Sequence, residues 1–221
     1  MDAMTEQDFL RPTAFVDSDN AQVQAFAGNA VTGVNGNKAR AIALYNAVRD
    51  TITYDPYVDY TDPGVFRASA VLAAGRGFCI GKSALLAASA RVVGIPTRPG
   101  FADVRNHLTS KRLRALTRSD IFIWHSYTEL LIDGRWVKCT PAFDRNLCER
   151  AGLAPLEFDG VNDSLFHPFD PAGRRHMEYL RDRGAFADVP HAAIIADLRR
   201  HYPGLIEHGK AGGNFHAEVA G

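Results

Sequence analysis

The stretch that decides the fold covers residues 75–98 and reads GRGFCIGKSALLAASARVVGIPTR. Two glycines flank a turn at its start, and glycine allows a close backbone approach that other residues resist. Cys79 follows, where a helix is expected to begin. The alanines and leucines after it make the helix apolar on most sides, which predicts that it lies in a core. Gly94 suits the left-handed position after the last turn, and Pro96 ends the helix.

The position of Cys79 is typical of a reactive thiol. A thiol in the first turn lies at the positive end of the helix dipole, which favours the thiolate. The alternative interpretation is a small buried hydrophobic residue. A nucleophilic cysteine needs a base, and His125 is the best candidate, in a predicted strand beside Trp124. A lone histidine in a strand is commonly structural, so the catalytic hypothesis requires that the two residues form a pair.

The composition is that of a soluble globular protein. The chain has 221 residues, of which 46% are hydrophobic and 23% charged, and a formal net charge of zero. The charge balance gives no basic surface for nucleic acid, and no stretch is long enough to span a membrane. The N-terminus lacks the pattern of a signal peptide. Three cysteines, an odd number, indicate reduced thiols and predict a cytoplasmic protein.

The segments before the cysteine predict helices and one loop. Several capping residues in 17–20 precede a short helix to about residue 31, and Asn37 is a candidate cap for the next helix. Apolar residues recur in this second helix at spacings of 4, 3 and 4, which indicates one face toward a core. Residues 53–64 form a loop with three tyrosines, a composition that often lines a site. A short helix from Arg67 leads into the glycine turn.

The second half predicts strands and then helices. Residues 97–104 favour a strand that Pro99 and Gly100 interrupt, and 106–118 a basic helix. Residues 121–132 and 135–140 predict an antiparallel hairpin around a turn of the Asp-Gly type. Residues 173–183 predict a helix, and Pro190 begins a last helix that Pro203 and Gly204 end. The glycine-rich segment 207–221 is expected to be frayed.

Four motifs in order carry a family resemblance. They are Gly77-Phe78-Cys79, the segment 91–98 with its Arg-Val-Val-Gly-Ile-Pro-Thr-Arg sequence, His125-Ser126-Tyr127-Thr128-Glu129, and the segment 134–141 that begins Gly-Arg-Trp. Together they resemble the transglutaminase-like superfamily, which is related to papain-type cysteine proteases and arylamine N-acetyltransferases. The resemblance spans roughly residues 53–144.

The resemblance implies an α+β fold with a papain-like transglutaminase core, in which the cysteine-bearing helix packs on an antiparallel β-sheet. We expect a single domain over residues 1–221. Its core would cover about 53–144, with N-terminal helices in 18–52, a C-terminal extension in 145–206 and a flexible tail in 207–221.

The resemblance also implies chemistry. The family acts through a Cys-His-Asp triad, in which the thiolate attacks an amide or peptide carbonyl and forms a thioester acyl-enzyme that water or an amine resolves. The backbone N–H of Cys79 would contribute to an oxyanion hole. Hydrolysis is favoured over protein crosslinking. The expected partner is a peptide or small amide substrate.

One position departs from the family pattern. The third triad slot, before Pro141, holds Thr140, whose hydroxyl can orient an imidazole but carries no charge. Asp144 and Glu129 are the alternatives, and Glu129 matches a family position that we expect to be structural. If neither carboxylate reaches His125, the site is either a modest dyad or a catalytically degenerate one that binds a peptide or small amide without turnover.

No cofactor is predicted. The cysteines at positions 139 and 148 lack the C-x-x-C spacing of a zinc site, so a metal centre is disfavoured.

Overall fold

The structure is a computed structural model that describes residues 5–106, 109–166, 177–211 and 213–219. No helix in these ranges is long and apolar enough to cross a membrane. The elements in chain order are η1 (Glu6–Leu10), α1 (Ala21–Ala30), α2 (Asn37–Thr51), β1 (Thr53–Tyr54), η2 (Pro63–Phe66), α3 (Ala68–Ala74), β2 (Arg76–Gly77), α4 (Cys79–Val92), β3 (Thr97–Asn106), α5 (Lys111–Thr117), β4 (Ile121–Ile132), β5 (Arg135–Cys139), α6 (Arg145–Arg150), β6 (Met177–Ala185), α7 (His191–His201), α8 (Pro203–His208), η3 (Gly209–Ala211) and α9 (Phe215–Glu218).

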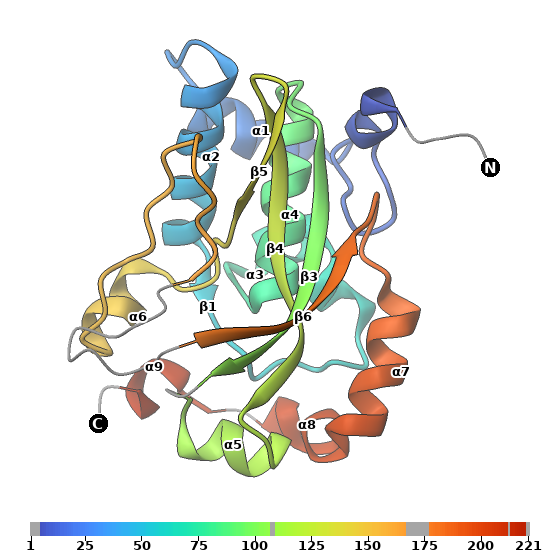
Figure 1. Cartoon of the computed structure of the whole chain (residues 1–221), viewed down its shortest axis with the longest axis vertical. Helices are drawn as coiled ribbons and strands as arrows, with labels where there is room; N and C mark the ends of the chain where they lie inside the picture. Colours follow the sequence, from blue (N-terminus) through green and yellow to red (C-terminus); the bar gives the residue numbers. More distant parts are fainter. Residues whose placement is uncertain (1–4, 107–108, 167–176, 212, 220–221) are drawn as a thin grey trace.

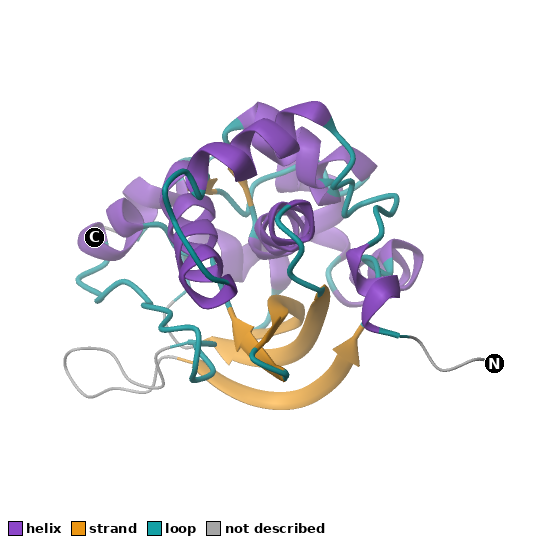
Figure 2. Cartoon of the chain, turned by 90° about the horizontal axis from the view of Figure 1, so that it is seen from above, coloured by secondary structure: helices purple, strands orange, loops and turns teal. Residues whose placement is uncertain are grey.

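A four-stranded antiparallel sheet with the order β5-β4-β3-β6 forms one layer of the molecule (Figure 1). Seen from above, the sheet is curled and the helices gather on its concave side (Figure 2). The β4–β5 hairpin turns at Asp133 and Gly134, whose φ angles are 50° and 75°. Two successive positive φ values suit the right-handed twist of the flanking strands. The predicted hairpin and its turn are therefore confirmed.

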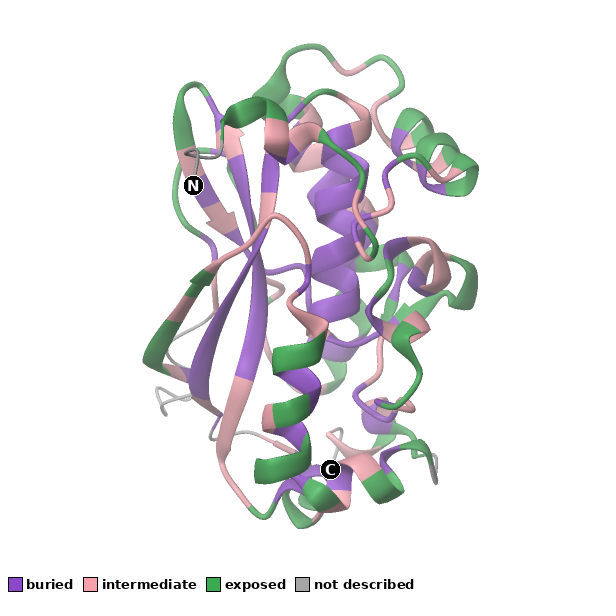
Figure 3. Cartoon of the chain, turned by 90° about the vertical axis from the view of Figure 1, so that its right-hand side faces the viewer, coloured by how far each residue is buried: buried purple, intermediate pink, exposed green. Residues whose placement is uncertain are grey.

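Helix α4 runs through the middle of the molecule. The sheet covers it on one side, and α1, α2 and α3 pack against it on the others. Every residue from Ile80 to Arg91 is buried, as Figure 3 shows. Gly94 follows the helix with a φ of 81°. The prediction of a buried cysteine helix that stops at a left-handed glycine is confirmed, and with it the α+β, papain-like class.

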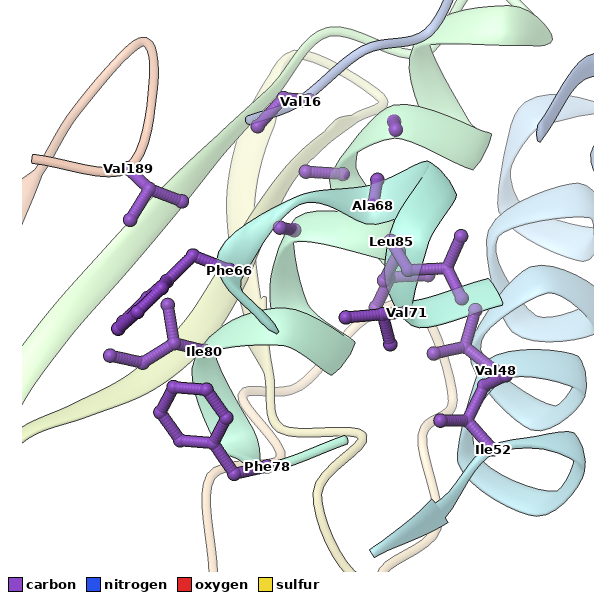
Figure 4. Close-up of a cluster of buried hydrophobic side chains, with 14 of the residues drawn as sticks. Val16, Val48, Ile52, Phe66, Ala68, Val71, Phe78, Ile80, Leu85 and Val189 are labelled. Carbon is purple, nitrogen blue, oxygen red and sulfur yellow. The ribbon is translucent and has the colours of Figure 1, made fainter. Parts of the chain in front are cut away.

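The start of α4 is fixed from two directions (Figure 4). Phe78 and Ile80 lie toward Phe66, and the rings of Phe66 and Phe78 meet edge to face with centroids 5.3 Å apart. Val71 of α3 packs on the other side, toward Ile52 at the end of α2. Edge-to-face aromatic pairs and close packing restrict movement of the backbone. The first turn of α4 is therefore held in one position relative to the sheet.

The strand predicted over 97–104 is present as β3, but two other predictions were wrong, the helix over 173–183 and the interruption of that strand at Pro99 and Gly100. Residues 177–183 belong to strand β6, whereas a helix was predicted over 173–183; residues 173–176 lie outside the described ranges. Strand β6 pairs with β3 along its length, and this pairing overrides the local preference. Strand β3 is also not interrupted. The carbonyl of Pro99 accepts a hydrogen bond from the N–H of Phe186 (2.9 Å), and the ring of Tyr127 covers Gly100.

The C-terminal segment differs from the frayed tail that we expected. Pro203 begins a further helix, α8, at the first helical position, where a missing N–H is tolerated. Helix α9 follows, capped by the side chain of Asn214. Phe215 is buried, and its ring centroid lies 5.5 Å from that of Tyr54. Aromatic burial thus ties this segment to the tyrosine loop near Cys79.

Candidate active site

Cys79 is the first residue of α4, directly after the short strand β2. Gly75 ends α3 in the left-handed conformation with a φ of 64° and forms the start of the predicted glycine turn. Gly77 has no room for a side chain, because a Cβ there would lie 2.9 Å from Cγ1 of Val71. The first intrahelical bond of α4 runs from the N–H of Lys82 to the carbonyl of Phe78. The N–H of Cys79 therefore precedes the helical hydrogen bonds and is at the position of an oxyanion donor.

The thiol of Cys79 rests in its protonated form. Burial raises its pKa to about 11, and the backbone N–H groups of Ser126 and Ile80 lower the pKa by less. The sequence led us to expect that the helix dipole would favour the thiolate. Desolvation outweighs the dipole because the charged form loses more hydration than one helix end returns. Nucleophilic attack near neutral pH therefore requires a neighbouring base.

His125 lies on β4 immediately after a β-bulge. Ala102 of β3 pairs with His125 and Val104 pairs with Phe122, so the single residue between them on β3 is opposite two residues of β4. Trp124 has a φ of 59°, which is unusual for a bulky residue. Bulges change the direction in which the next side chain points and occur beside active sites. The bulge thus decides where the His125 imidazole lies.

A charged cluster holds this bulge in place. Oδ1 of Asp103 accepts the backbone N–H of Trp124 (3.1 Å), and Oδ2 of Asp197 accepts its indole N–H (2.8 Å). The guanidinium of Arg183 bonds both carboxylates and lies 4.4 Å from the centroid of the indole ring. Charge-assisted bonds and a cation–π contact together stabilise the positive φ. Strand β6 and helix α7, which supply Arg183 and Asp197, are thus connected to the position of His125.

Cys79 and His125 line the same cavity. Tyr54 and Tyr60 of the tyrosine loop also line it, as the sequence suggested for this loop. Tyr57 instead bonds Ser110 and Glu218. The structure therefore brings the predicted nucleophile and the predicted base to the walls of one cavity.

Thr140 lies on the other side of His125. Both residues line a second cavity. The backbone of Thr140 is fixed: its N–H donates to the carbonyl of Ser164 (2.9 Å) and its carbonyl accepts from the hydroxyl of Tyr45 (3.2 Å). The hydroxyl of Thr140 is buried and has no hydrogen-bond partner among the described residues. A buried hydroxyl without a hydrogen-bond partner costs free energy. The Thr140 hydroxyl is therefore a candidate to bond a group at the second cavity, which His125 also lines.

The two alternative carboxylates have other partners. Asp144 caps α6 by accepting the N–H of Leu147 (2.9 Å), accepts the N–H of Tyr54 (2.8 Å), and has Oδ2 3.3 Å from Nε2 of His216.

Glu129 is buried and pairs with Arg98 across the β3–β4 ladder. It also lies 3.7 Å from Nζ of Lys138. These contacts are what a structural residue makes, which agrees with the expectation from the family position.

The sequence analysis missed one wall of the Cys79 cavity. Three residues line it, Leu198 of α7, Leu205 of α8 and Tyr202 between the two helices, although they are more than 110 residues from Cys79 in the chain. Their spacing of four and three residues was a signal of one helical face, but nothing in the sequence indicates where that face packs.

Within the described ranges, no group of three or more His, Cys, Asp or Glu side chains is arranged to hold a metal ion. His107, His167 and His176 lie outside those ranges.

Comparisons with known proteins bear on the family. The family model for the transglutaminase-like superfamily matches residues 24–141. A crystal structure from Cytophaga hutchinsonii, described as a "Putative Cysteine Protease", is similar in fold with a TM-score of 0.50 and 18% sequence identity. The alignment covers 84% of this chain and 48% of that one, so this chain spans about half the length of that protein. A search among curated proteins found no match. The match of the family model over more than half of the sequence shows that the chain belongs to the transglutaminase-like superfamily.

Proposed function

We propose that the protein is a cysteine-dependent hydrolase or acyltransferase that acts on an amide or peptide bond. The observation that carries this proposal is that Cys79, at the start of a buried helix, and His125, directly after a bulge, line one cavity. The superfamily and the fold support the same chemistry.

The reaction begins with a neutral thiol, because burial raises the pKa of Cys79 to about 11. The imidazole of His125 accepts the thiol proton while Sγ attacks the carbonyl carbon of the substrate. The negative charge on the carbonyl oxygen is stabilised by the backbone N–H at the start of α4. His125 then returns the proton to the amine as the C–N bond breaks. Water or a second amine attacks the resulting thioester and restores the thiol.

Thr140 orients His125 in this proposal. Its backbone is fixed by the bonds to Ser164 and Tyr45, and the residue lines the cavity that reaches the imidazole. A hydroxyl accepts a hydrogen bond from the ring and sets its tautomer, but it does not offset the charge of an imidazolium. Asp144 remains the second choice for this role, although its oxygens already accept the N–H groups of Leu147 and Tyr54.

The experiment is turnover of acyl p-nitroanilides by the wild type and by variants of each proposed role. Cys79→Ala should abolish turnover, and His125→Ala should lower it by about 100-fold or more. Thr140→Val should lower it about fivefold, the value of one hydrogen bond. Thr128→Val is the matched control, because the buried hydroxyl of Thr128 bonds the carbonyl of Ser83 and faces α4. Unchanged turnover in Cys79→Ala would refute the proposal.

The second candidate is a degenerate domain that binds an amide without turnover. The observation that favours it is the neutral residue in the third slot, Thr140. Thr140→Asp separates the two candidates, since a carboxylate beside the imidazole stabilises the imidazolium. In an enzyme this variant should raise turnover. A binder should show no turnover in either form, while ligand affinity survives Cys79→Ala.

A further inference from the structure

The cavity that Cys79 and His125 line is too small to hold an amide substrate. Its volume is about 60 Å³. That volume has room for a few water molecules, whereas sites for small molecules occupy about 300–1,000 Å³. Attack of Cys79 on an amide carbonyl therefore requires that one wall of this cavity moves.

The wall from α7 and α8 is bonded to the strand that carries the base. The hydroxyl of Tyr202 accepts the N–H of Ile123 (3.1 Å) and donates to the carbonyl of Ile121 (2.5 Å), both on β4. On α7, Asp197 accepts the indole N–H of Trp124 (2.8 Å). Movement of this wall would break the bonds that hold the bulge before His125, so it is not the wall that opens.

The tyrosine loop, residues 53–64, is the other wall that is built from one short segment. It contributes Tyr54, Pro56 and Tyr60 to the cavity. Residues 55–62, all within the described ranges, form no helix or strand, and the hydroxyl of Tyr60 donates to the carbonyl of Pro56 in the same loop (2.8 Å). Segments without regular backbone pairing open at a lower free energy than strands or buried helices. The tyrosine loop is therefore the wall that can move.

The end of the chain holds this loop in place. We call residues 213–219 the strap. The ring of Phe215 is buried, with its centroid 5.5 Å from that of Tyr54 and 6.1 Å from that of Tyr57. The carboxylate of Glu218 accepts the hydroxyl of Tyr57. A Cβ at Gly213 would lie 2.7 Å from the ring of Tyr57, so the backbone of the strap also approaches the loop closely.

The strap also contacts the carboxylate that fixes the backbone of the loop. Oδ2 of Asp144 accepts the N–H of Tyr54 (2.8 Å) and lies 3.3 Å from Nε2 of His216. Helix α9, within the strap, lies beside α6, which Asp144 caps (Figure 1). The strap therefore contacts both the ring of Tyr54 and the group that holds its backbone.

A larger cavity lies on a different side of the strap. It has a volume of about 430 Å³ and is lined by residues 213–216 of the strap, by residues 53–55 and by residues 74–76. Tyr54 lines both this cavity and the small one at Cys79. Displacement of the Tyr54 ring would join the two cavities, and the joined space would have the size of a small-molecule site.

We infer that the strap is an autoinhibitory cover, which holds the tyrosine loop against Cys79 and must be released before a substrate reaches the thiol. The inference rests on the proposed function, because only an amide or peptide at Cys79 needs the additional space. The strap lies outside residues 24–141, which the family model matches, so this control belongs to the C-terminal part of the chain.

The test measures how fast Cys79 in the full chain reacts with fluorescein-5-maleimide, a bulky reagent, at pH 7. Sγ adds to the maleimide double bond, and the thiol proton is replaced by one that the neighbouring carbon takes up from water. Peptide mass spectrometry identifies the labelled residue. Cys139 is fully buried in β5, so its labelling in the same sample reports global unfolding.

Phe215→Ala removes the ring that anchors the strap. The labelling rate of Cys79 should rise about 10-fold or more, with the rate of Cys139 unchanged, because the loop loses a buried aromatic contact. Phe9→Ala is the matched control, since Phe9 is also buried, packs edge to face on Trp136 (5.4 Å) and does not line the Cys79 cavity. It should keep the wild-type labelling rate. The same Cys79 rate in both variants would overturn the inference.

Glu218→Ala is a milder variant that leaves the apolar core intact. It removes one hydrogen bond from Tyr57, so Cys79 should be labelled about fivefold faster. Glu207→Ala, which changes an exposed glutamate of α8, is its control and should label at the wild-type rate.

The labelling and the turnover of acyl p-nitroanilides fail separately. Wild-type Cys79 that is labelled as fast as in Phe215→Ala and Glu218→Ala would overturn the strap and leave the proposed function standing. Faster labelling in both strap variants with no turnover in any form would support the strap as a cover and refute the proposed function. Faster labelling together with faster turnover is the result that we expect.

Discussion

Lys82 is expected to make the protein more stable as the pH rises above neutral. It lies one turn after Cys79 and is fully buried. Its ammonium donates to the carbonyls of Arg49 (2.9 Å) and Ile52 at the end of α2. Burial lowers the pKa of Lys82 from 10.5 to about 7. The buried amine therefore connects the nucleophile helix to α2 at a cost in free energy that depends on pH.

The sign follows from the proton balance. The pKa of Lys82 is lower in the folded than in the unfolded state, so the unfolded state binds more protons between about pH 7 and pH 10.5. Stability must rise with pH in that range. A difference of about 3.5 pKa units corresponds to about 5 kcal/mol, of which about 2 kcal/mol is recovered between about pH 6 and pH 8.5. Above that range the buried cysteines act in the opposite direction, because burial raises their pKa values.

The variant Lys82→Met isolates this effect. Methionine fills a similar volume without a titrating group, so the rise of about 2 kcal/mol should be absent from its stability curve. Urea unfolding at a series of pH values measures the free energy of unfolding of both proteins. Lys111→Met, which changes an exposed lysine of α5, is the control and should run parallel to the wild type. Parallel curves for the wild type and Lys82→Met would refute the reasoning.

Three further predictions follow from single contacts. Asp103→Asn weakens the cluster that holds the bulge and should lower turnover about tenfold and shift its pH profile, while the β-sheet content measured by circular dichroism stays unchanged. Gly81→Ala should destabilise the protein by about 2 kcal/mol or more in thermal unfolding, because the new Cβ would lie 2.6 Å from the backbone oxygen of Val65. A rise in Tm would contradict this prediction. Glu129→Gln breaks the buried pair with Arg98 and should lower the free energy of unfolding in urea by about 1–3 kcal/mol. Turnover per folded molecule should stay unchanged. Loss of turnover would instead make Glu129 a positioning residue.

The parts of the fold that the sequence predicted are those with local causes. The left-handed Gly94 follows α4, Asn20 caps α1 through its side chain, and a hairpin turns at Asp133 and Gly134. Each depends on the conformational preference of one or two residues. The buried helix was predictable because it is apolar all round.

The parts that the sequence did not predict depend on distant segments. Strand β6 exists because it pairs with β3, whose Gly100 in turn is covered by Tyr127 on β4. The bulge at Trp124 depends on Asp103 and Arg183, which lie about 20 and 60 residues away in the chain. The wall that α7 and α8 add to the Cys79 cavity also depends on packing between segments that are distant in the chain. The pKa of Cys79 was expected to fall because the sequence shows the helix start but not the burial that raises it.

The central claim is that His125 activates a neutral Cys79. The most direct measurement is the rate of Cys79 alkylation by iodoacetamide against pH, in the wild type and in His125→Ala, with the labelled residue identified by peptide mass spectrometry. We predict reaction of the wild type near neutral pH, and reaction of His125→Ala only as the thiol itself ionises toward a pKa of about 11. Equal rates for the two proteins at neutral pH would contradict the account, because Cys79 would then react without its base.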